Sequence, residues 1–519
     1  MNGAEALIKT LTNSGVEVCF ANPGTSEMQL VAAIDKQDGM RAVLGLFEGV
    51  VTGATDGYGR MADKPAVTLL HLGAGLANGC ANLHNARRAF SPLVNIVGDH
   101  ATYHLQYDAP LTSDIVGIAK PFSQWVETST SPVDLVEKSA RAVSESLNFP
   151  GQISTLIAPA DHAWDEVDVT AVSATKPTTP ICDDDNIEQA VSVLQKDGPT
   201  AILLGGMALR EDALELAGRI AAATGARLIC ETFTARLQRG AGRVTVERIP
   251  YFGEMAADFL KEFKQVVIVG TKAPVSFFAY PNKPSWLMPE NANLVTLADP
   301  HQCPIDALSR VVNKLNAPAE ACHVQDKIIP PVEEGQLTAL GVGAVVAQLM
   351  PEDTIVSDGA ATAGLAIFPM TAGASPHEWM MVTGGAIGQG LPLGIGAAIA
   401  CPDRKVLCLE ADGSAMYTLQ ALWTMARENL DVTTVILNNG SYAILNIELA
   451  RVGVTDPGKK ALSMLDLTNP SLDWVSLSEG MGVPAVRADT VTGFRTALED
   501  ALNQKGPRLI EAIIPLPVA

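Results

Sequence analysis

The chain has 519 residues, of which 47% are hydrophobic, 18% charged and 5% aromatic. This length exceeds one ordinary hydrophobic core and predicts two or three domains. The formal net charge of −21 argues against nucleic acid and membrane partners, because both need a basic surface. The sequence contains no apolar run long enough to predict a membrane span. The N-terminus lacks a signal-peptide pattern and the eight cysteines form no C-x-x-C pair, so we expect a cytoplasmic protein.

Short apolar runs alternate with helical patterns in the first segment, which we place at residues 1–165. The expected helices are 4–13, 27–36 and 49–61, and the expected strands are 17–21, 42–46 and 66–71. Strands that alternate with helices predict βαβ units and a largely parallel sheet. Residues 165–180 are rich in Val, Thr, Ser, Pro and acidic residues, which predicts a linker.

The same alternation predicts a central domain at 181–330 and a third domain at 336–519, with a second linker at 316–335. The expected central elements are strands 200–204, 227–230 and 265–270 and helix 213–224. The expected elements of the third domain are strands 354–356, 406–410, 433–438 and 508–514 and helix 419–429. The predicted fold class is therefore α/β, with three domains that are each a mainly parallel sheet flanked by helices.

The most informative pair of residues follows two of these strands. Asp412 comes after strand 406–410, and Asn439 comes after strand 433–438, 27 positions later (439 − 412). In a right-handed βαβ unit both strand ends emerge at one sheet edge, where such sheets bind ligands. A carboxylate from Asp412, an amide from Asn439 and a backbone carbonyl at Ser441 are hard oxygen ligands. They predict a Mg²⁺ site in which Ca²⁺ could substitute.

The residues after Asp412 predict a diphosphate site beside the metal. Gly413 and Ser414 offer backbone N–H groups near a helix start, and Gly413 permits close approach of a phosphate. We also expect Tyr442, which follows the second strand end, to contact the cofactor. Taken alone, an Asp-Gly-Ser after a strand is more often a simple turn, so the pairing across one βαβ unit carries the argument.

Asp412-Gly413, followed by Asn438-Asn439, resembles the signature of thiamine-diphosphate-dependent enzymes. The family usually has Gly-Asp-Gly, and this chain has Ala411 at the first position. The resemblance implies the thiamine-diphosphate-binding fold in the first and third domains. It also implies a cofactor held between the first domain of one subunit and the third domain of another. A homodimer is then the minimum assembly, and a homotetramer is expected.

Two further motifs extend the resemblance. The family activates the aminopyrimidine ring with a glutamate of the first domain, and Glu48, ahead of Asp56-Gly57-Tyr58, fits that position. The alternative is an ordinary helix N-terminal Glu, which the helix dipole favours. Residues 383–392 read TGGAIGQGLP, with Ile387 where the family has an aliphatic residue that bends the cofactor. The Gly385 carbonyl and the Ile387 N–H would contact the pyrimidine.

Within the family the chain is most similar to benzoylformate decarboxylase, followed by acetohydroxyacid synthase. The resemblance implies that the Thr25 hydroxyl touches substrate and that His71 relays protons, although a structural His remains the alternative. Phe278 stands where the decarboxylase has a second histidine. Ile444 and Glu448, four apart on a predicted helix, match substrate-pocket positions, with a solvated Glu448 as the alternative.

The expected function is a thiamine-diphosphate- and Mg²⁺-dependent decarboxylase of a small 2-oxo acid, with carboligase activity as an extension. The sequence leaves four alternatives open: an acetolactate synthase-type carboligase, a 2-hydroxyacyl-CoA lyase, a flavin-assisted oxidase of the same superfamily, and a non-catalytic paralogue that binds the cofactor. We expect no FAD, although Gly205-Gly206 is too weak a signal to decide between an enzyme with a flavin and one without, and an absorption spectrum would decide this point.

Overall fold

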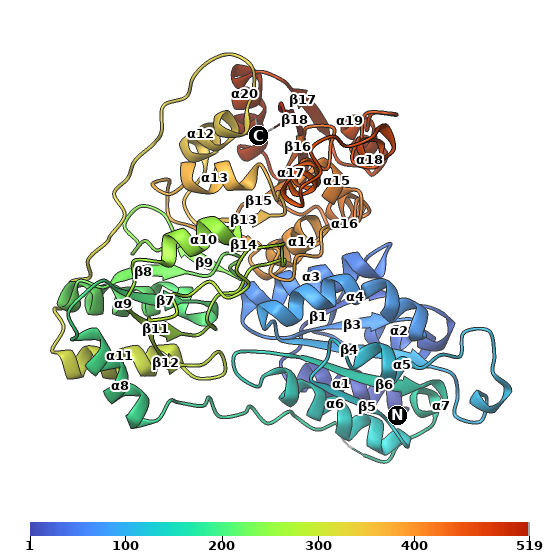
Figure 1. Cartoon of the computed structure of the whole chain (residues 1–519). Coiled ribbons are helices and arrows are strands. Elements are labelled where there is room, and N and C mark those ends of the chain that lie inside the picture. The colour runs from blue at the N-terminus through green and yellow to red at the C-terminus, as the bar shows by residue number, and fades with distance from the viewer. Residues whose placement is uncertain (170, 517–519) are drawn as a thin grey trace.

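The structure is a computed structural model that describes residues 1–169 and 171–516. It contains three mainly parallel sheets flanked by helices, which confirms the predicted fold class (Figure 1). None of the helices in this described part of the chain combines the length and the apolar character that crossing a bilayer requires. The described residues of two connecting segments form no helix or named strand and run along the outside of the molecule. One segment lies between α7 (Ala160–Trp164) and α8 (Asp184–Leu194), and the other lies between α11 (Pro304–Leu315) and α12 (Ala339–Leu349).

The first sheet has six parallel strands in the order β2-β1-β3-β4-β6-β5. These strands are β1 (Val18–Asn22), β2 (Arg41–Leu44), β3 (Ala66–Leu70), β4 (Leu93–Asp99), β5 (Trp125–Thr128) and β6 (Ile153–Pro159). Its helices are α1 (Gly3–Asn13), α2 (Met28–Asp35), α3 (Glu48–Ala62), α4 (Leu72–Ala89), α5 (Ile115–Ala119), α6 (Pro132–Ser146) and α7 (Ala160–Trp164). The 3₁₀ turns η1 (Thr25–Glu27) and η2 (Leu105–Tyr107) follow β1 and β4.

The second sheet has five parallel strands in the order β10-β8-β7-β11-β12. These strands are β7 (Thr200–Leu204), β8 (Arg227–Cys230), β10 (Glu247–Arg248), β11 (Gln265–Val269) and β12 (Asn293–Ala298). The accompanying helices are α8 (Asp184–Leu194), η3 (Gly206–Leu209), α9 (Glu211–Thr224), α10 (Gly253–Leu260) and α11 (Pro304–Leu315).

The third sheet has seven strands in the order β17-β18-β16-β15-β13-β14-β9. These strands are β9 (Leu237–Arg239), β13 (Thr354–Asp358), β14 (His377–Met381), β15 (Val406–Ala411), β16 (Val432–Asn438), β17 (Ala485–Ala488) and β18 (Arg508–Ile513). Its helices are α12 (Ala339–Leu349), α13 (Gly364–Met370), α14 (Gly390–Ala400), α15 (Asp412–Ala415), α16 (Ala421–Arg427), α17 (Ala443–Arg451), α18 (Lys459–Ser463), α19 (Trp474–Gly480) and α20 (Val491–Leu502). Strand β9 comes from the central segment and pairs antiparallel with β14, an exchange that the sequence pattern did not indicate.

Helices α3 and α14 join the first and third sheets into one hydrophobic core. The two helices approach so closely that only glycine fits at the contact. A Cβ at Gly57 would lie 2.1 Å from the carbonyl oxygen of Leu393, and a Cβ at Gly396 would lie 1.9 Å from that of Ala54. The helix that begins at Glu48 therefore packs directly against α14, a helix of the third sheet.

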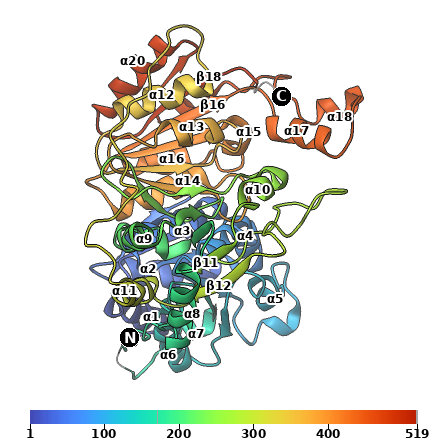
Figure 2. The same ribbon diagram turned by 60° about the vertical axis from the view of Figure 1, so that its left-hand side comes forward.

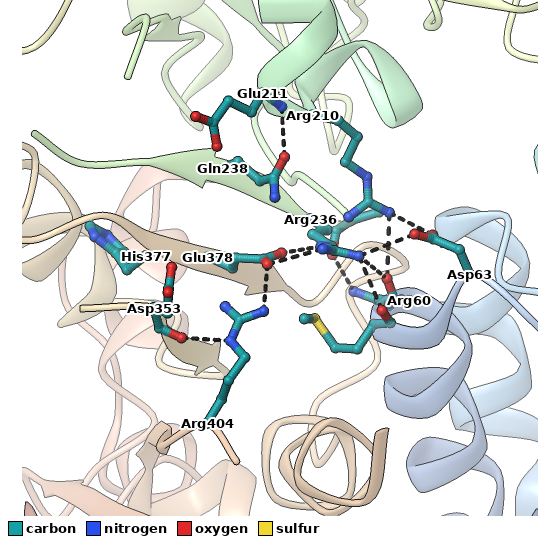
Figure 3. A network of polar contacts seen from close by, with 12 residues as sticks. Arg60, Asp63, Arg210, Glu211, Arg236, Gln238, Asp353, His377, Glu378 and Arg404 are labelled. Atoms are coloured by element: carbon teal, nitrogen blue, oxygen red, sulfur yellow. Dashed lines mark hydrogen bonds and ion pairs between the residues drawn. The ribbon is translucent and has the colours of Figure 1, made fainter. Parts of the chain in front are cut away.

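A buried network of arginines and carboxylates joins all three sheets (Figure 3). Arg236 pairs with Glu378 on β14 and donates from Nη1 to the carbonyl oxygen of Arg60 at 2.9 Å. Arg404 donates to the same Glu378 at 2.8 Å. Burial by itself would raise the pKa of Glu378, but the two arginines outweigh it and lower the pKa to about 2.

We expect Glu378→Gln to destabilise the fold by about 3–5 kcal/mol at pH 7, because it removes the buried counter-charge of Arg236 and leaves only the half-exposed Asp63 at 3.4 Å. The folded-state pKa is lowered, so the stabilisation is complete above the ordinary pKa of 4.5 and is lost as pH falls toward 2. The thermal midpoints of wild type and variant should therefore converge as pH falls from about 4.5 to about 2. The control is Glu211→Gln, which removes an exposed partner of Arg243 and should cost less than about 1 kcal/mol. Equal losses in both variants would contradict the argument.

Candidate active site

The carboxyl ends of β15 and β16 lie side by side, since Ala411 and Leu437 are partners in the parallel ladder. Asp412 follows β15 and is 1% exposed. Its Oδ2 accepts the N–H of Gly440 at 2.8 Å, and its Oδ1 accepts the N–H of Gly413 at 2.9 Å. Burial raises the pKa of Asp412, and these backbone donors oppose the rise. The structure thus brings Asp412 against the turn that carries Asn439.

The turn at residues 439–441 supplies further oxygen atoms at this edge. Asn439 Oδ1 accepts the N–H of Ser441 at 3.0 Å. The Ser441 hydroxyl donates to the carbonyl oxygen of Leu465 at 3.0 Å and accepts from Asn446 at 2.9 Å. Because that hydroxyl is engaged, the Ser441 carbonyl is the better candidate ligand. A carboxylate, an amide and a carbonyl form a donor set that fits a hard cation such as Mg²⁺.

The loop at residues 383–390 packs directly against the start of α15. The Gly388 N–H donates to the Ser414 hydroxyl at 3.0 Å. Gly385 and Gly388 have φ of +75° and +89°, values that favour glycine, so the loop bends twice around the partly exposed Ile387. The two motifs that sequence analysis assigned to one cofactor are therefore neighbours in space.

Gly413 and Tyr442 also lie against each other at this edge. A Cβ at Gly413 would come within 2.4 Å of Cε1 of the Tyr442 ring. Any larger residue at 413 would displace that ring, so the absence of a side chain allows Tyr442 to pack against the start of α15.

Helix α4 of the first sheet holds the 383–390 loop in place. Asn85, which is fully buried, donates to the Ala386 carbonyl oxygen at 2.8 Å and accepts the Ala386 N–H at 3.2 Å. The ring Nε2 of His84 lies 3.1 Å from the Gly384 carbonyl oxygen. Sequence analysis missed both residues. The one available signal was a row of polar residues on an otherwise apolar helix.

Glu48 begins α3 and lies at the other end of the same α4 surface. Its Oε2 accepts from Asn78 of α4 at 3.0 Å, and its side chain is partly exposed. Asn82 links the two regions, because it donates to the Gly49 carbonyl oxygen at 2.7 Å and accepts from Asn85 at 3.0 Å. A continuous row of buried amides therefore connects the start of α3 with the 383–390 loop.

Comparison with known proteins identifies this arrangement. Residues 1–121 match the thiamine pyrophosphate enzyme N-terminal TPP binding domain, and residues 359–512 match the C-terminal TPP binding domain. The chain belongs to the thiamine pyrophosphate enzyme family. The Glu48 and His71 regions lie in the first match, and Asp412 and Asn439 lie in the second.

Several relatives of this thiamine pyrophosphate enzyme have been named. A Mycobacterium tuberculosis protein provisionally named acetolactate synthase large subunit IlvX is 50% identical over 99% of both chains. Benzoylformate decarboxylase of Pseudomonas aeruginosa is 27% identical over 98% of this chain and 97% of its own. Among solved structures, a thiamine diphosphate-dependent 4-hydroxybenzoylformate decarboxylase from Rhodococcus jostii RHA1 has a TM-score of 0.88 with 23% identity. That likeness covers 100% of both chains and shows the shared fold.

Three further residues come together at the carboxyl edge of the first sheet. His71 is the N-cap residue of α4, and its Nδ1 lies 2.8 Å from Oε2 of Glu27. Thr25 begins η1 and is exposed. Sequence analysis selected Thr25 and His71 but placed Glu27 in an ordinary helix start, because its partner lies 44 positions away.

Glu448, which we expected in the substrate pocket, takes part in a link between α17 and the second sheet. It accepts from the Tyr280 hydroxyl and from Arg451 Nε, the latter at 3.2 Å. Arg451 also pairs with Glu254 of α10, and these hydrogen bonds lower the pKa of Glu254 to about 2. Ile444, one turn earlier on α17, is partly exposed. The Glu448 carboxylate is thus mostly buried and is held through Oε2 by Tyr280 and Arg451.

Phe278 stands where the resemblance places the second histidine of the decarboxylase, in the segment between β11 and β12. It is 54% exposed and packs edge-on against Phe277 at 4.9 Å between ring centroids. Phe277 is the ring that faces the loop, since a Cβ at Gly385 would lie 2.5 Å from its Cζ. Phe277, His84 and Gly384 line one cavity of about 410 Å³.

A second cavity, of about 1070 Å³, lies beside the 439–441 turn and is lined by α17, α18 and Leu465. Figure 2 shows α17 and α18 projecting from the rest of the third sheet, which opens this side of the site. Glu48 lines neither of the two cavities. The cavity beside the 439–441 turn and the partly exposed Glu48 are thus separate features of one chain.

Proposed function

We propose that the chain is a thiamine-diphosphate- and Mg²⁺-dependent lyase that decarboxylates a small 2-oxo acid. The observation that carries the proposal is the buried Asp412 carboxylate, which contacts the 439–441 turn while Ser414 contacts the 383–390 loop. When bound, thiamine diphosphate supplies the nucleophilic carbon and the electron sink that removal of CO₂ from a 2-oxo acid requires.

Each end of the cofactor has its own set of candidate residues. Asp412, Asn439 and the Ser441 carbonyl would hold Mg²⁺, or Ca²⁺ in its place, and through it the diphosphate. The Gly413 and Ser414 backbone and the Tyr442 ring would contact the diphosphate end. The Gly385 carbonyl and the Ile387 N–H would position the pyrimidine. Glu48 would exchange a proton with a ring nitrogen and so control the charge on the ring.

The substrate would lie between His71, Thr25 and the α17 face that carries Ile444 and Glu448. His71 would donate the proton that completes the product. Glu448, linked to Tyr280, would set the polarity of the far wall. Phe278 would contribute through its packing on Phe277 rather than as a direct wall.

The proposed assembly is a homodimer at minimum and a homotetramer in full, located in the cytoplasm. The exposed Leu46 (45%), two residues before Glu48, supports burial of this surface against a second copy. Glu48 of one copy would then meet Asp412 of the other. The eight unpaired cysteine thiols support a reducing compartment.

Carboligation is the second candidate function. It is favoured by the relative that is 50% identical over the whole chain and carries an acetolactate synthase name. In that case the same residues would hold the cofactor, and the reaction would end by capture of a second carbonyl compound instead of a proton.

A panel of 2-oxo acids, assayed for CO₂ release and for ligated product with thiamine diphosphate and Mg²⁺, tests the proposal. We expect CO₂ release from at least one acid and its loss on chelation, with recovery on adding Mg²⁺ or Ca²⁺. Aldehyde as the main product identifies a decarboxylase, and a hydroxy-ketone product identifies a carboligase. Cofactor binding without CO₂ release from any acid would instead support a non-catalytic paralogue.

A further inference from the structure

The side chain of Glu27 is enclosed at the carboxyl edge of the first sheet, where it meets His71. It is 0% exposed, whereas the His71 side chain is 22% exposed. Glu27 Oε2 accepts the Gly24 N–H at 2.7 Å and lies 2.8 Å from His71 Nδ1. An ionised carboxylate oxygen can only accept, so an ionised Glu27 requires that Nδ1 of His71 carries the proton between them.

The surrounding backbone is shaped to admit this pair. A Cβ at Gly98 on β4 would lie 1.8 Å from Glu27 Oε1, and a Cβ at Gly24 would lie 2.3 Å from the His71 ring. Leu72, the residue after His71, has φ of +47° although it is fully buried and not a glycine. A backbone strain of this kind costs about 1–3 kcal/mol and is found mainly at functional sites.

His71 also lies beside Glu48. The Glu48 Oε1 atom and the His71 Cβ atom are 3.3 Å and 3.4 Å from the position that a Cβ at Gly75 would occupy. His71 and the carboxylate proposed to act on the cofactor therefore both border Gly75, while Glu27 is fully buried in the protein interior.

We propose that Glu27 is the positioning residue of His71: it fixes the orientation of the imidazole and its Nδ1–H tautomer, and so leaves Nε2 as the nitrogen that faces substrate. A carboxylate behind a histidine commonly serves this purpose in catalytic and metal sites. The role of Nε2 rests on the proposed function, whereas the tautomer of His71 does not depend on it.

The electrostatics of the pair are consistent with this role. Burial raises the pKa of Glu27, and the Gly24 N–H and a charged His71 oppose that rise. The carboxylate and an imidazolium therefore stabilise each other. The other titratable groups on the packed elements are Glu48 at the start of α3 and Asp99 and His100 at the end of β4.

A double-mutant cycle tests whether Glu27 acts through His71. With an accepted 2-oxo acid, Glu27→Gln should lower kcat about 10–100-fold with little change in KM. In a His71→Ala background the same change should alter kcat by no more than about twofold, because the residue it positions is gone. The alkaline limb of the pH–rate profile should also move to lower pH, since a proton-donating imidazolium without its carboxylate partner gives up its proton more readily.

Asp134→Asn is the matched control. This partly buried carboxylate near the first sheet accepts from the Thr130 N–H at 2.7 Å. Its side-chain partners are Thr130 and Lys138, so it acts away from the Glu27–His71 contact. It should leave kcat and the pH profile unchanged. An equal loss from Glu27→Gln in the wild-type and His71→Ala backgrounds would overturn the proposal, because it would show a merely structural role.

The ¹⁵N spectrum of histidine-labelled protein supplies a readout that needs no substrate. The His71 signals, assigned by their loss in His71→Ala, should show the Nδ1–H tautomer in wild type and a shift toward Nε2–H in Glu27→Ala. Identical His71 signals in wild type and Glu27→Ala would refute the proposal. If no 2-oxo acid is turned over but the tautomer shifts as expected, the proposed function fails while the positioning role stands.

Discussion

Replacing Glu48 by glutamine is expected to lower kcat by about 10²–10⁴-fold, the range that a positioned proton-transfer group contributes. The amide has the shape of the carboxylate and can still accept from Asn78, so α3 and its packing on α14 should not change. What is lost is the negative charge and the ability to exchange a proton with the cofactor ring.

The Glu48→Gln variant should still retain the cofactor, with its Kd for thiamine diphosphate changed by less than about tenfold, because the diphosphate and metal are held at the Asp412 edge. Steady-state kinetics and equilibrium binding measure the two quantities separately. The control is Glu211→Gln, which alters another glutamate at the first position of a helix, α9, and should leave both unchanged. Wild-type turnover in Glu48→Gln would remove this residue from the mechanism.

Replacing Asp412 by asparagine is expected to weaken Mg²⁺ binding at least about 100-fold, because Asp412 is the one anionic ligand in the proposed set. The loss is compounded by geometry. Both carboxylate oxygens accept backbone N–H groups, from Gly413 and from Gly440, and an amide can accept only one of these. The cofactor should then dissociate with the metal, and turnover should fall with it.

Calorimetric titration with Mg²⁺ in the presence of thiamine diphosphate measures this effect. Asp431→Asn is a control at the opposite end of the same strand pair, where Asp431 pairs with Lys405 at 2.5 Å. It should reduce stability slightly and leave Mg²⁺ affinity unchanged. Equal Mg²⁺ affinity in wild type and Asp412→Asn would place the metal elsewhere.

Local patterns were sufficient to predict most of the strands. The strands at 200–204 and 227–230 were predicted to the residue, and the one at 406–410 ends one residue later in the structure. Buried parallel strands are short, continuous apolar runs bounded by turn residues, so their limits can be read from neighbouring residues. Strand β9 was not predicted, because its three residues join a sheet whose other strands are distant in the sequence.

The contacts of the candidate site likewise divide into those that the sequence could predict and those that it could not. Asp412 and Asn439 could be predicted to lie together because a single βαβ unit separates them, and its handedness places both strand ends at one edge. Asn85 and Ala386 are 301 positions apart, and nothing in either segment indicates the other. The tight fit of Phe277, rather than Phe278, against Gly385 likewise depends on how the loop after β11 packs.

The amino-acid sequence alone thus determined the α/β class, the membership in a cofactor-binding family and the residues with the required chemistry, because these depend on periodicity, residue type and short spacing. The tertiary structure alone decided which side chains hold them in place: Glu27 behind His71, the α4 amides beneath the 383–390 loop, and Arg236 between three sheets. Hydrogen bonds between distant segments form only where packed helices and strands bring donor and acceptor within about 3 Å, and that distance is a property of the whole fold.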